Sequence, residues 1–145
     1  MSVLFTDVMT VYNYIYDEKT EQESWKRTVV KGVQWSHNKD AVGVSNGVQT
    51  GKKVESITID FQRRYGNETY IDPMRFKLLE NKAGFWTLNA KDCKDVVVLG
   101  ESEEDISNEY RIHQLKQDFQ YCGTVTSVSD NRNRRFLQQI KVVAE

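Results

Sequence analysis

Apolar and polar residues alternate along several stretches of this chain, as they do in β-strands that bury one face. Residues 6–16 are rich in β-branched and aromatic side chains, and residues 24–37 continue the alternation. Residues 56–61 repeat it, with Ile57 and Ile59 on one face. This period of two predicts a mostly-β fold, a small β-barrel or sandwich with long hairpin loops and one or two short helices.

Turn residues divide the predicted strands into hairpins. Asn46-Gly47 is a strong signal for a two-residue turn and predicts a long, glycine-rich and polar hairpin over residues 40–55. Thr50-Gly51-Lys52 offers a second turn within it. Near the end of the chain, residues 123–130 and 136–145 predict a terminal hairpin.

Two short segments predict helices. Pro73 directly after Asp72 is typical of a helix start, and this helix is expected to end by Gly84. Residues 113–120 have the spacing of a second short helix. The residues available for burial are Phe76, Leu78 and Leu79 in the first helix and Leu115 and Phe119 in the second.

Length and charge indicate a single soluble domain over residues 1–145. The 145 residues include 20 basic and 21 acidic side chains, a balance that excludes a global electrostatic attraction to nucleic acid or to an anionic membrane. No apolar run is long enough to span a bilayer, and the N-terminus lacks the basic and apolar regions of a secretion signal. We therefore expect a cytosolic site of synthesis and no membrane partner.

The residue types that usually carry catalysis or bind metal are few and scattered. Cys93, Cys122, His37 and His113 are all more than five residues apart, so no local metal-ligand spacing exists. The glycines occur singly, without a phosphate-binding loop or a nucleophile elbow. A cysteine paired in space with His113 is the only candidate nucleophilic arrangement. We expect no enzymatic activity, no cofactor and no metal.

Two tryptophans alternate with cations between residues 24 and 37. Trp25 and Trp35 are expected on the same face as Val29 and Val33, which favours burial in the core, and Gly32 predicts a bulge. The alternative is an oligonucleotide-binding barrel that stacks bases on exposed rings and follows phosphates with basic groups. The cations that would do so are Lys26, Arg27 and Lys31.

Three groups of residues are candidates for contacts with a partner. Tyrosine provides a large contact area at small entropic cost, so a tyrosine row on one strand fits an interface as well as a barrel wall. The acidic segment 101–109 contains no base and complements the arginine-rich turn of a neighbouring subunit. That turn could otherwise be solvated or contact DNA. The candidates are Tyr12, Tyr14 and Tyr16; Glu103, Glu104 and Asp105; and Arg132, Arg134 and Arg135.

Several sequence blocks point to a family. The N-terminal third contains Phe5-Thr6-Asp7, Thr10-Val11-Tyr12-Asn13-Tyr14 and a stretch over residues 25–35 that begins and ends with tryptophan. Later blocks are Gly84–Asn89, Asp95–Glu101 and Ser127–Arg132. Together they cover nearly the whole chain, and they resemble a family of small proteins encoded in phages and prophages of Firmicutes.

That family is similar to head-closure (stopper) proteins and other head–tail connector proteins of tailed bacteriophages. The resemblance implies a structural virion protein, a small β-barrel or sandwich that forms a homo-oligomeric ring in the neck after synthesis in the host bacterial cytoplasm. It implies portal, adaptor and tail proteins as partners, and passing contact with genomic DNA in the channel. Tail completion or minor capsid decoration remains an alternative role. The long hairpin supplies the channel or docking loop candidates Ser45, Asn46, Gly47, Lys52 and Lys53.

Overall fold

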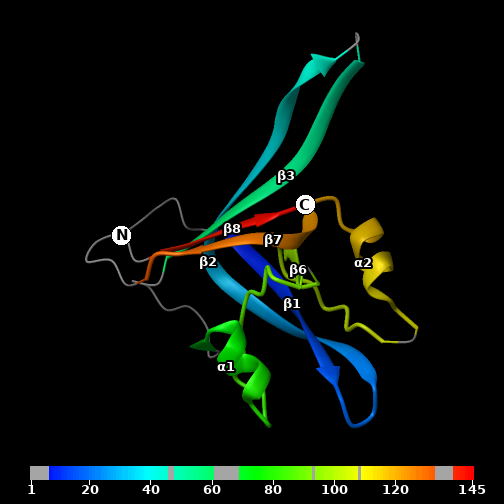
Figure 1. Ribbon diagram of the computed structural model, residues 1–145, viewed down its shortest axis with the longest axis vertical. Coiled ribbons are helices and arrows are strands. Elements are labelled where there is room, and N and C mark those ends of the chain that lie inside the picture. Colours follow the sequence, from blue (N-terminus) through cyan, green and yellow to red (C-terminus); the bar gives the residue numbers. More distant parts are fainter. Residues whose placement is uncertain (1–6, 46–47, 61–68, 93, 108, 133–138) are drawn as a thin grey trace.

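The chain folds into a closed six-stranded antiparallel barrel in the order β1-β2-β3-β8-β7-β6, with β6 returning to β1 (Figure 1). The mostly-β barrel predicted from the alternation is therefore confirmed. The strands are β1 (Asp7–Asp17), β2 (Gln22–Ser45), β3 (Val48–Asp60), β6 (Val96–Leu99), β7 (Cys122–Asp130) and β8 (Gln139–Ala144). The computed structural model describes residues 7–45, 48–60, 69–92, 94–107, 109–132 and 139–145.

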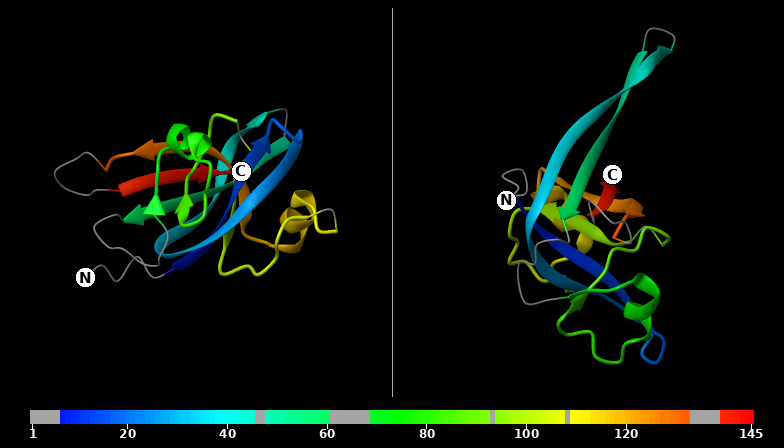
Figure 2. Two further views of the ribbon diagram at one scale, coloured as in Figure 1. Left: turned by 90° about the horizontal axis from the view of Figure 1, so that it is seen from below. Right: turned by 90° about the vertical axis from the view of Figure 1, so that its left-hand side faces the viewer.

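Two connections leave the barrel and cover different parts of it. The connection between β3 and β6 contains β4 (Thr69–Tyr70), α1 (Pro73–Leu78) and β5 (Phe85–Trp86), and β4 and β5 form a parallel pair. The connection between β6 and β7 contains the acidic segment and α2 (Ile112–Asp118). Figures 1 and 2 place α1 and α2 on different sides of the barrel. No helix in the described ranges is long and apolar enough to cross a membrane.

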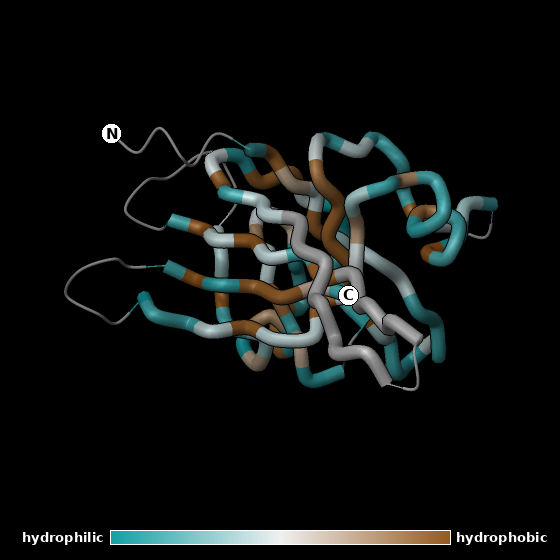
Figure 3. Tube along the Cα trace, turned by 90° about the horizontal axis from the view of Figure 1, so that it is seen from above, coloured by the Kyte–Doolittle hydropathy of each residue, from teal (hydrophilic) through white to brown (hydrophobic). Residues whose placement is uncertain are grey.

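The main hydrophobic core fills the barrel, and hydrophobic segments concentrate on its strands (Figure 3). Met9 and Val11 on β1 are fully buried there, and Val97 on β6 joins them. Trp86 and Leu88 from the connection after β4 belong to the same core, so this connection packs against the barrel. The core is therefore built from residues far apart in the sequence.

A second hydrophobic cluster lies on the outer face of β1 and β6, under α2. Tyr12, Val96 and Val98 point outward from these strands and pack with Leu115 of α2. The predicted second helix is thus confirmed, with Leu115 buried and Phe119 half-buried. Because this cluster covers its outer face, β6 is buried on both sides, which explains its continuous run of valines.

A bulge at Gly32 reverses the faces of β2. Asp7 pairs with Val33 and Val8 with Lys31, so Gly32 is an extra residue on β2, and its φ of 80° suits glycine. The predicted bulge is confirmed, but the prediction of one shared face for both tryptophans is wrong. Val33 and Trp35 point into the barrel, whereas Trp25 packs against the outer cluster, because the side chains change faces at the extra residue.

The predicted long hairpin projects from the barrel as a two-stranded ribbon (Figure 1). β8 pairs with β3 as far as Glu55, and β1 pairs with β2 as far as Val33. Beyond these points β2 and β3 pair with no other strand of the described chain, and they pair with each other up to Ser45 and Val48, which enclose the predicted turn. The second predicted turn is wrong, because Gly51 lies within β3 opposite Ala41. We call residues 38–45 and 48–54 the arm.

The helix predicted at Pro73 forms, but it buries less than expected. Phe76 is buried, Leu79 is half-buried, and Leu78 is 80% exposed, so the expected burial of Leu78 is wrong. The helix has only 6 residues and ends at Leu78, so one of its side chains, Phe76, is buried against the barrel. Asp72 occupies the N-cap position, but its carboxylate pairs with Arg132 instead of capping the helix.

Candidate functional site

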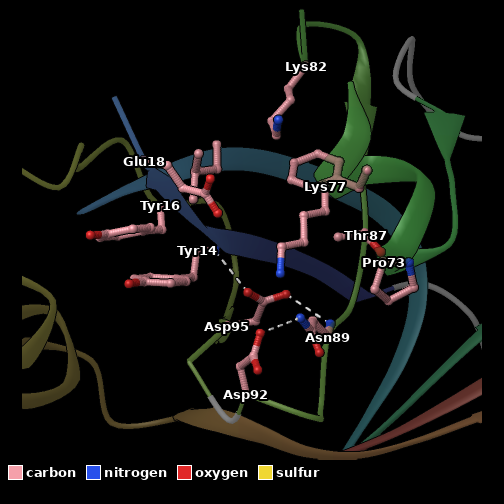
Figure 4. Close-up of a pocket in the computed structure, with 12 residues that line it drawn as sticks. Tyr14, Tyr16, Glu18, Pro73, Lys77, Lys82, Thr87, Asn89, Asp92 and Asp95 are labelled. Carbon is pink, nitrogen blue, oxygen red and sulfur yellow. Dashed lines mark hydrogen bonds between the residues drawn. The ribbon is translucent and has the colours of Figure 1, made fainter. Parts of the chain in front are cut away.

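A hollow of about 140 Å³ lies at the end of the barrel opposite the arm, between β1, α1 and the loop before β6 (Figure 4). β1 extends beyond its last pair with β6, the pair of Tyr12 with Val96, so its end is free to form one wall. Side chains from all three elements line the hollow, among them Tyr14, Tyr16, Phe76, Lys77, Asn89 and Asp95.

Asp95 forms the floor of the hollow and is only 3% exposed. One carboxylate oxygen accepts a hydrogen bond of 2.8 Å from the Tyr14 N–H. The other accepts hydrogen bonds of 2.9 Å from the Asn89 N–H and from the Asn13 side-chain amide. The carboxylate thus holds β1 and the loop together just where the ladder between β1 and β6 ends.

Asn13 completes this junction from inside the barrel. Its side-chain amide donates to the Thr87 carbonyl oxygen, and the Thr87 N–H donates to the Asn13 side-chain oxygen at 3.2 Å. The side chain therefore binds the Thr87 peptide in both directions, as a neighbouring strand would. Asn13 and Asp95 replace main-chain pairing where β6 no longer lies beside β1.

Burial shifts the ionisation of the floor of the hollow. It raises the pKa of the Asp95 carboxyl to about 6, and the hydrogen bonds from Tyr14, Asn89 and Asn13 oppose that rise. The carboxyl is therefore ionised at pH 7, and its charge is held by three donors in a site with little water.

We expect the Asp95 carboxyl to titrate near pH 6 in carbon-13 NMR of the labelled protein. The folded chain then binds this proton more tightly than the unfolded chain, so the contribution of Asp95 to stability falls as the pH rises from about 4 to about 6 and is constant above that range. The Asp95→Asn spectrum should lack the resonance. A midpoint below pH 4 would contradict the prediction.

Tyr14 and Tyr16 differ in how freely they face solvent at the rim. The Tyr14 ring packs edge-on against Trp25, with ring centres 5.3 Å apart, and its hydroxyl donates to the Glu23 carboxylate at 2.9 Å. Lys94 lies 4.4 Å from the centre of the Tyr14 ring. Tyr14 is thus fixed within its own chain, whereas Tyr16 is 50% exposed.

The hollow contains charged side chains of both signs. Its walls carry Lys77 and Lys82 together with Glu18, Asp92 and Asp95. The Lys82 ammonium donates to the Leu79 carbonyl oxygen, and the Asp95 carboxylate already accepts three hydrogen bonds. Among the described residues, no three His, Cys, Asp or Glu side chains are grouped to hold a metal. Charges of both signs would accept a polar group of a partner.

The predicted tyrosine row divides into a buried and an exposed part. Tyr12 is fully buried, and its hydroxyl lies 2.7 Å from the Ser102 hydroxyl and donates to the Glu104 carbonyl oxygen at 2.6 Å. The expectation that Tyr12 lines an interface is therefore corrected, because its ring forms the outer core under α2. Tyr14 and Tyr16 lie at the hollow.

Of the arginine turn, the structure describes Arg132, and this side chain does not pair with the acidic segment of its own chain. Glu103, Glu104 and Asp105 are exposed, and Asp105 pairs with Arg27 at 2.9 Å. Arg132 pairs with Asp130 at 2.8 Å and with Asp72 at 3.0 Å, and it lies 4.7 Å from the centre of the Tyr70 ring. Arg132 is thus held by its own chain, and Arg134 and Arg135 lie outside the described residues.

The tryptophans do not form the stacking surface that oligonucleotide binding would use. Trp35 is buried in the barrel, where its indole N–H donates to the Glu55 carboxylate at 2.7 Å. Trp25 lies on the opposite face of β2, and its indole N–H donates to the Lys94 carbonyl oxygen at 3.2 Å. The two rings therefore cannot bind successive bases on one surface.

The remaining candidates are separated or lie on the arm. The Cys122 thiol donates to the Phe119 carbonyl oxygen at 3.2 Å, His113 is exposed on α2, and Cys93 lies outside the described residues. Ser45, Lys52 and Lys53 belong to the strands of the arm, and Asn46 and Gly47 lie outside the described residues.

Sequence reasoning missed the residues that build the hollow. Asn13 and Asp95 were strand residues in the sequence pattern, and nothing local indicated that they would meet across 82 positions. One signal was available, because Asn13 interrupts the apolar face that contains Val11. A buried asparagine needs polar partners, and it could have been paired with a neighbouring buried acid.

The fold is that of a small closed β-barrel protein with a projecting arm at one end and a hollow floored by Asp95 at the other. Residues 4–145 match a family described as a family of unknown function (DUF6751), and the chain belongs to that family. A search of curated proteins and a search of solved structures found no match.

Proposed function

We propose that this protein is a structural component of a tailed bacteriophage virion, a head–tail connector (neck or head-closure) protein. Copies of the chain form a ring between the portal or adaptor and the tail, without enzymatic activity. The arm and the opposite end of the barrel would then meet different partners. These partners are portal or adaptor proteins, tail proteins and other copies of the chain.

The arm is the observation that carries the proposal. The arm contains eight residues of β2, 38–45, and therefore reaches about 25 Å beyond the barrel. Neither outer edge of the arm has a strand partner in the described chain. An isolated two-stranded ribbon is marginally stable in water, and open strand edges pair readily with other chains. A neighbouring protein that pairs with these open edges would therefore stabilise the arm.

The position of the resemblance blocks agrees with this proposal. The block that contains Asn13 forms β1, residues 25–35 form β2 within the barrel, and Asp95 opens the block that forms β6. The blocks that resemble the phage family thus include the ones that contribute Asn13 and Asp95 to the barrel and the hollow.

Mass spectrometry of purified virions tests the proposal directly. We expect virions of the phage that encodes this chain to contain it in several copies per particle, as a ring requires. Infectious virions that lack the chain would contradict the proposal. A monomeric recombinant protein would not, because the portal can serve as the template for ring assembly.

A shortened arm tests whether the arm makes the essential contact. Replacing residues 39–53 with Asn-Gly places a two-residue turn next to the Asn38–Val54 pair and leaves the barrel strands intact. The variant should keep the circular dichroism spectrum and melting temperature of the barrel but fail to enter virions. Normal incorporation would exclude the arm as the connecting element.

A further inference from the structure

We propose that the exposed face of α1 joins neighbouring copies of this chain by docking on the acidic segment 101–109 of the next copy. This inference rests on the proposed ring and names the surfaces that would close it. The α1 face is defined here by Met74, Arg75, Lys77 and Leu78.

The α1 face exposes apolar side chains that the barrel leaves uncovered. Met74 is 72% exposed and Leu78 is 80% exposed, and their spacing of four residues places them side by side on one helix. Tyr16, the other large hydrophobic side chain with high exposure in the described chain, belongs to β1, and its ring points away from α1 (Figure 4), so Met74 and Leu78 form a separate apolar patch. Apolar surface gathered at one place indicates a contact with another protein.

Positive charge accompanies this apolar surface. Arg75 and Lys77 are exposed, and α1 contains no acidic residue. Within the described part of the chain, neither side chain lies within 4 Å of a carboxylate. The face therefore offers Arg75 beside a methionine and a leucine, and Lys77 lies where this face borders the hollow, with its ammonium directed toward Asp95 (Figure 4). This positive charge fits an acidic partner surface.

The same chain carries the complement of that face. Segment 101–109 contains five acids and no base, and only Asp105 forms an ion pair within the described residues. Ser102 anchors the segment, because its N–H and hydroxyl bond to side chains of β1. The exposed acids left without a cation are Glu101, Glu103, Glu104 and Glu109.

The positions of the two surfaces favour a second copy as the occupant. α1 and the acidic segment lie on different sides of the barrel in Figures 1 and 2, so one copy cannot join them by itself. A surface that docks on a different surface of an identical neighbour makes a head-to-tail contact, and such contacts close into rings when the rotation permits. Two complementary patches on separate sides are what this arrangement requires.

Charge reversal in two separate variants tests the contact. Arg75→Glu/Lys77→Glu reverses the α1 face, and Glu103→Lys/Glu104→Lys reverses the acidic segment. In a phage that lacks the wild-type gene, each variant supplied alone should give about a hundredfold fewer infectious particles than the wild-type chain. A chain that carries all four substitutions should restore infectivity, because every contact in the ring then joins opposite charges again.

The controls separate this inference from the proposed function. Lys31→Glu/Lys141→Glu lowers the net charge by the same amount as Arg75→Glu/Lys77→Glu, but at exposed positions of β2 and β8. This control variant should support infection normally. Each variant should keep the melting temperature of the wild-type barrel. If wild-type chain restores infection but the chain with all four substitutions does not, α1 docks on a portal or tail protein and the inference is overturned. If wild-type chain is absent from virions, the proposed function fails as well.

Discussion

Asp95→Ala is expected to lower the free energy of unfolding by about 4 kcal/mol at pH 7. The substitution removes the acceptor of the Tyr14 N–H, of the Asn89 N–H and of one N–H of the Asn13 side-chain amide, whose bond to Thr87 remains. Unsatisfied buried donors cost about 1–3 kcal/mol each. The substitution also removes the free-energy cost of burying the Asp95 carboxylate, and this offsets part of the loss. Urea denaturation followed by tryptophan fluorescence measures the difference.

Two further variants identify the cause of this loss. Asp95→Asn keeps the size of the side chain but turns an amide toward donors, so it should also destabilise the fold. Asp92→Ala, at an exposed acid of the same loop, should change the free energy of unfolding by less than about 0.5 kcal/mol.

The loss of stability caused by Asp95→Ala should be larger at pH 5 than at pH 7, because burial favours the protonated carboxyl of the wild-type protein. Equal stability of Asp95→Ala and Asp92→Ala would contradict the assigned role.

The strands of the barrel and the hairpin that joins β2 to β3 could be predicted because both have local causes. Alternation of side chains follows from the pleat of a strand, and Asn46-Gly47 has the backbone freedom that a two-residue turn needs. The face of each strand was predictable only up to the first irregularity. Gly32 was recognisable as a bulge, but its effect on Trp25 had to be followed through the change of register.

The candidate site depended on contacts that have no local cause. Asn13 and Asp95 meet only because β6 stops pairing with β1 after Tyr12. The cation that a sequence would pair with the acidic segment, Arg132, instead binds acids on its own side of the fold. The ion pair that does form joins Asp105 to Arg27 across 78 positions, where no spacing rule applies.

Leu115→Ala is expected to lower the free energy of unfolding by about 3 kcal/mol. Leu115 is fully buried between α2 and the outward-facing Tyr12, Val96 and Val98, and the truncation leaves a cavity that the two rigid strands cannot close. The loss should come mainly from α2 and the outer cluster, because the barrel interior keeps its own core. Hydrogen exchange measures this directly, with faster exchange in α2 than in β3 or β8.

An exposed position of the same helix provides the control. Gln117→Ala should leave both stability and exchange close to wild type, because its side chain covers no apolar surface. If Leu115→Ala speeds exchange equally in all strands, α2 and the barrel unfold as one unit and the separate outer cluster is contradicted. If exchange rises in α2 and the acidic segment alone, Leu115 also fixes the surface that the ring contact would use, since Tyr12 joins the cluster to Ser102 and Glu104. Loosening the outer cluster would then weaken assembly while the barrel remains folded.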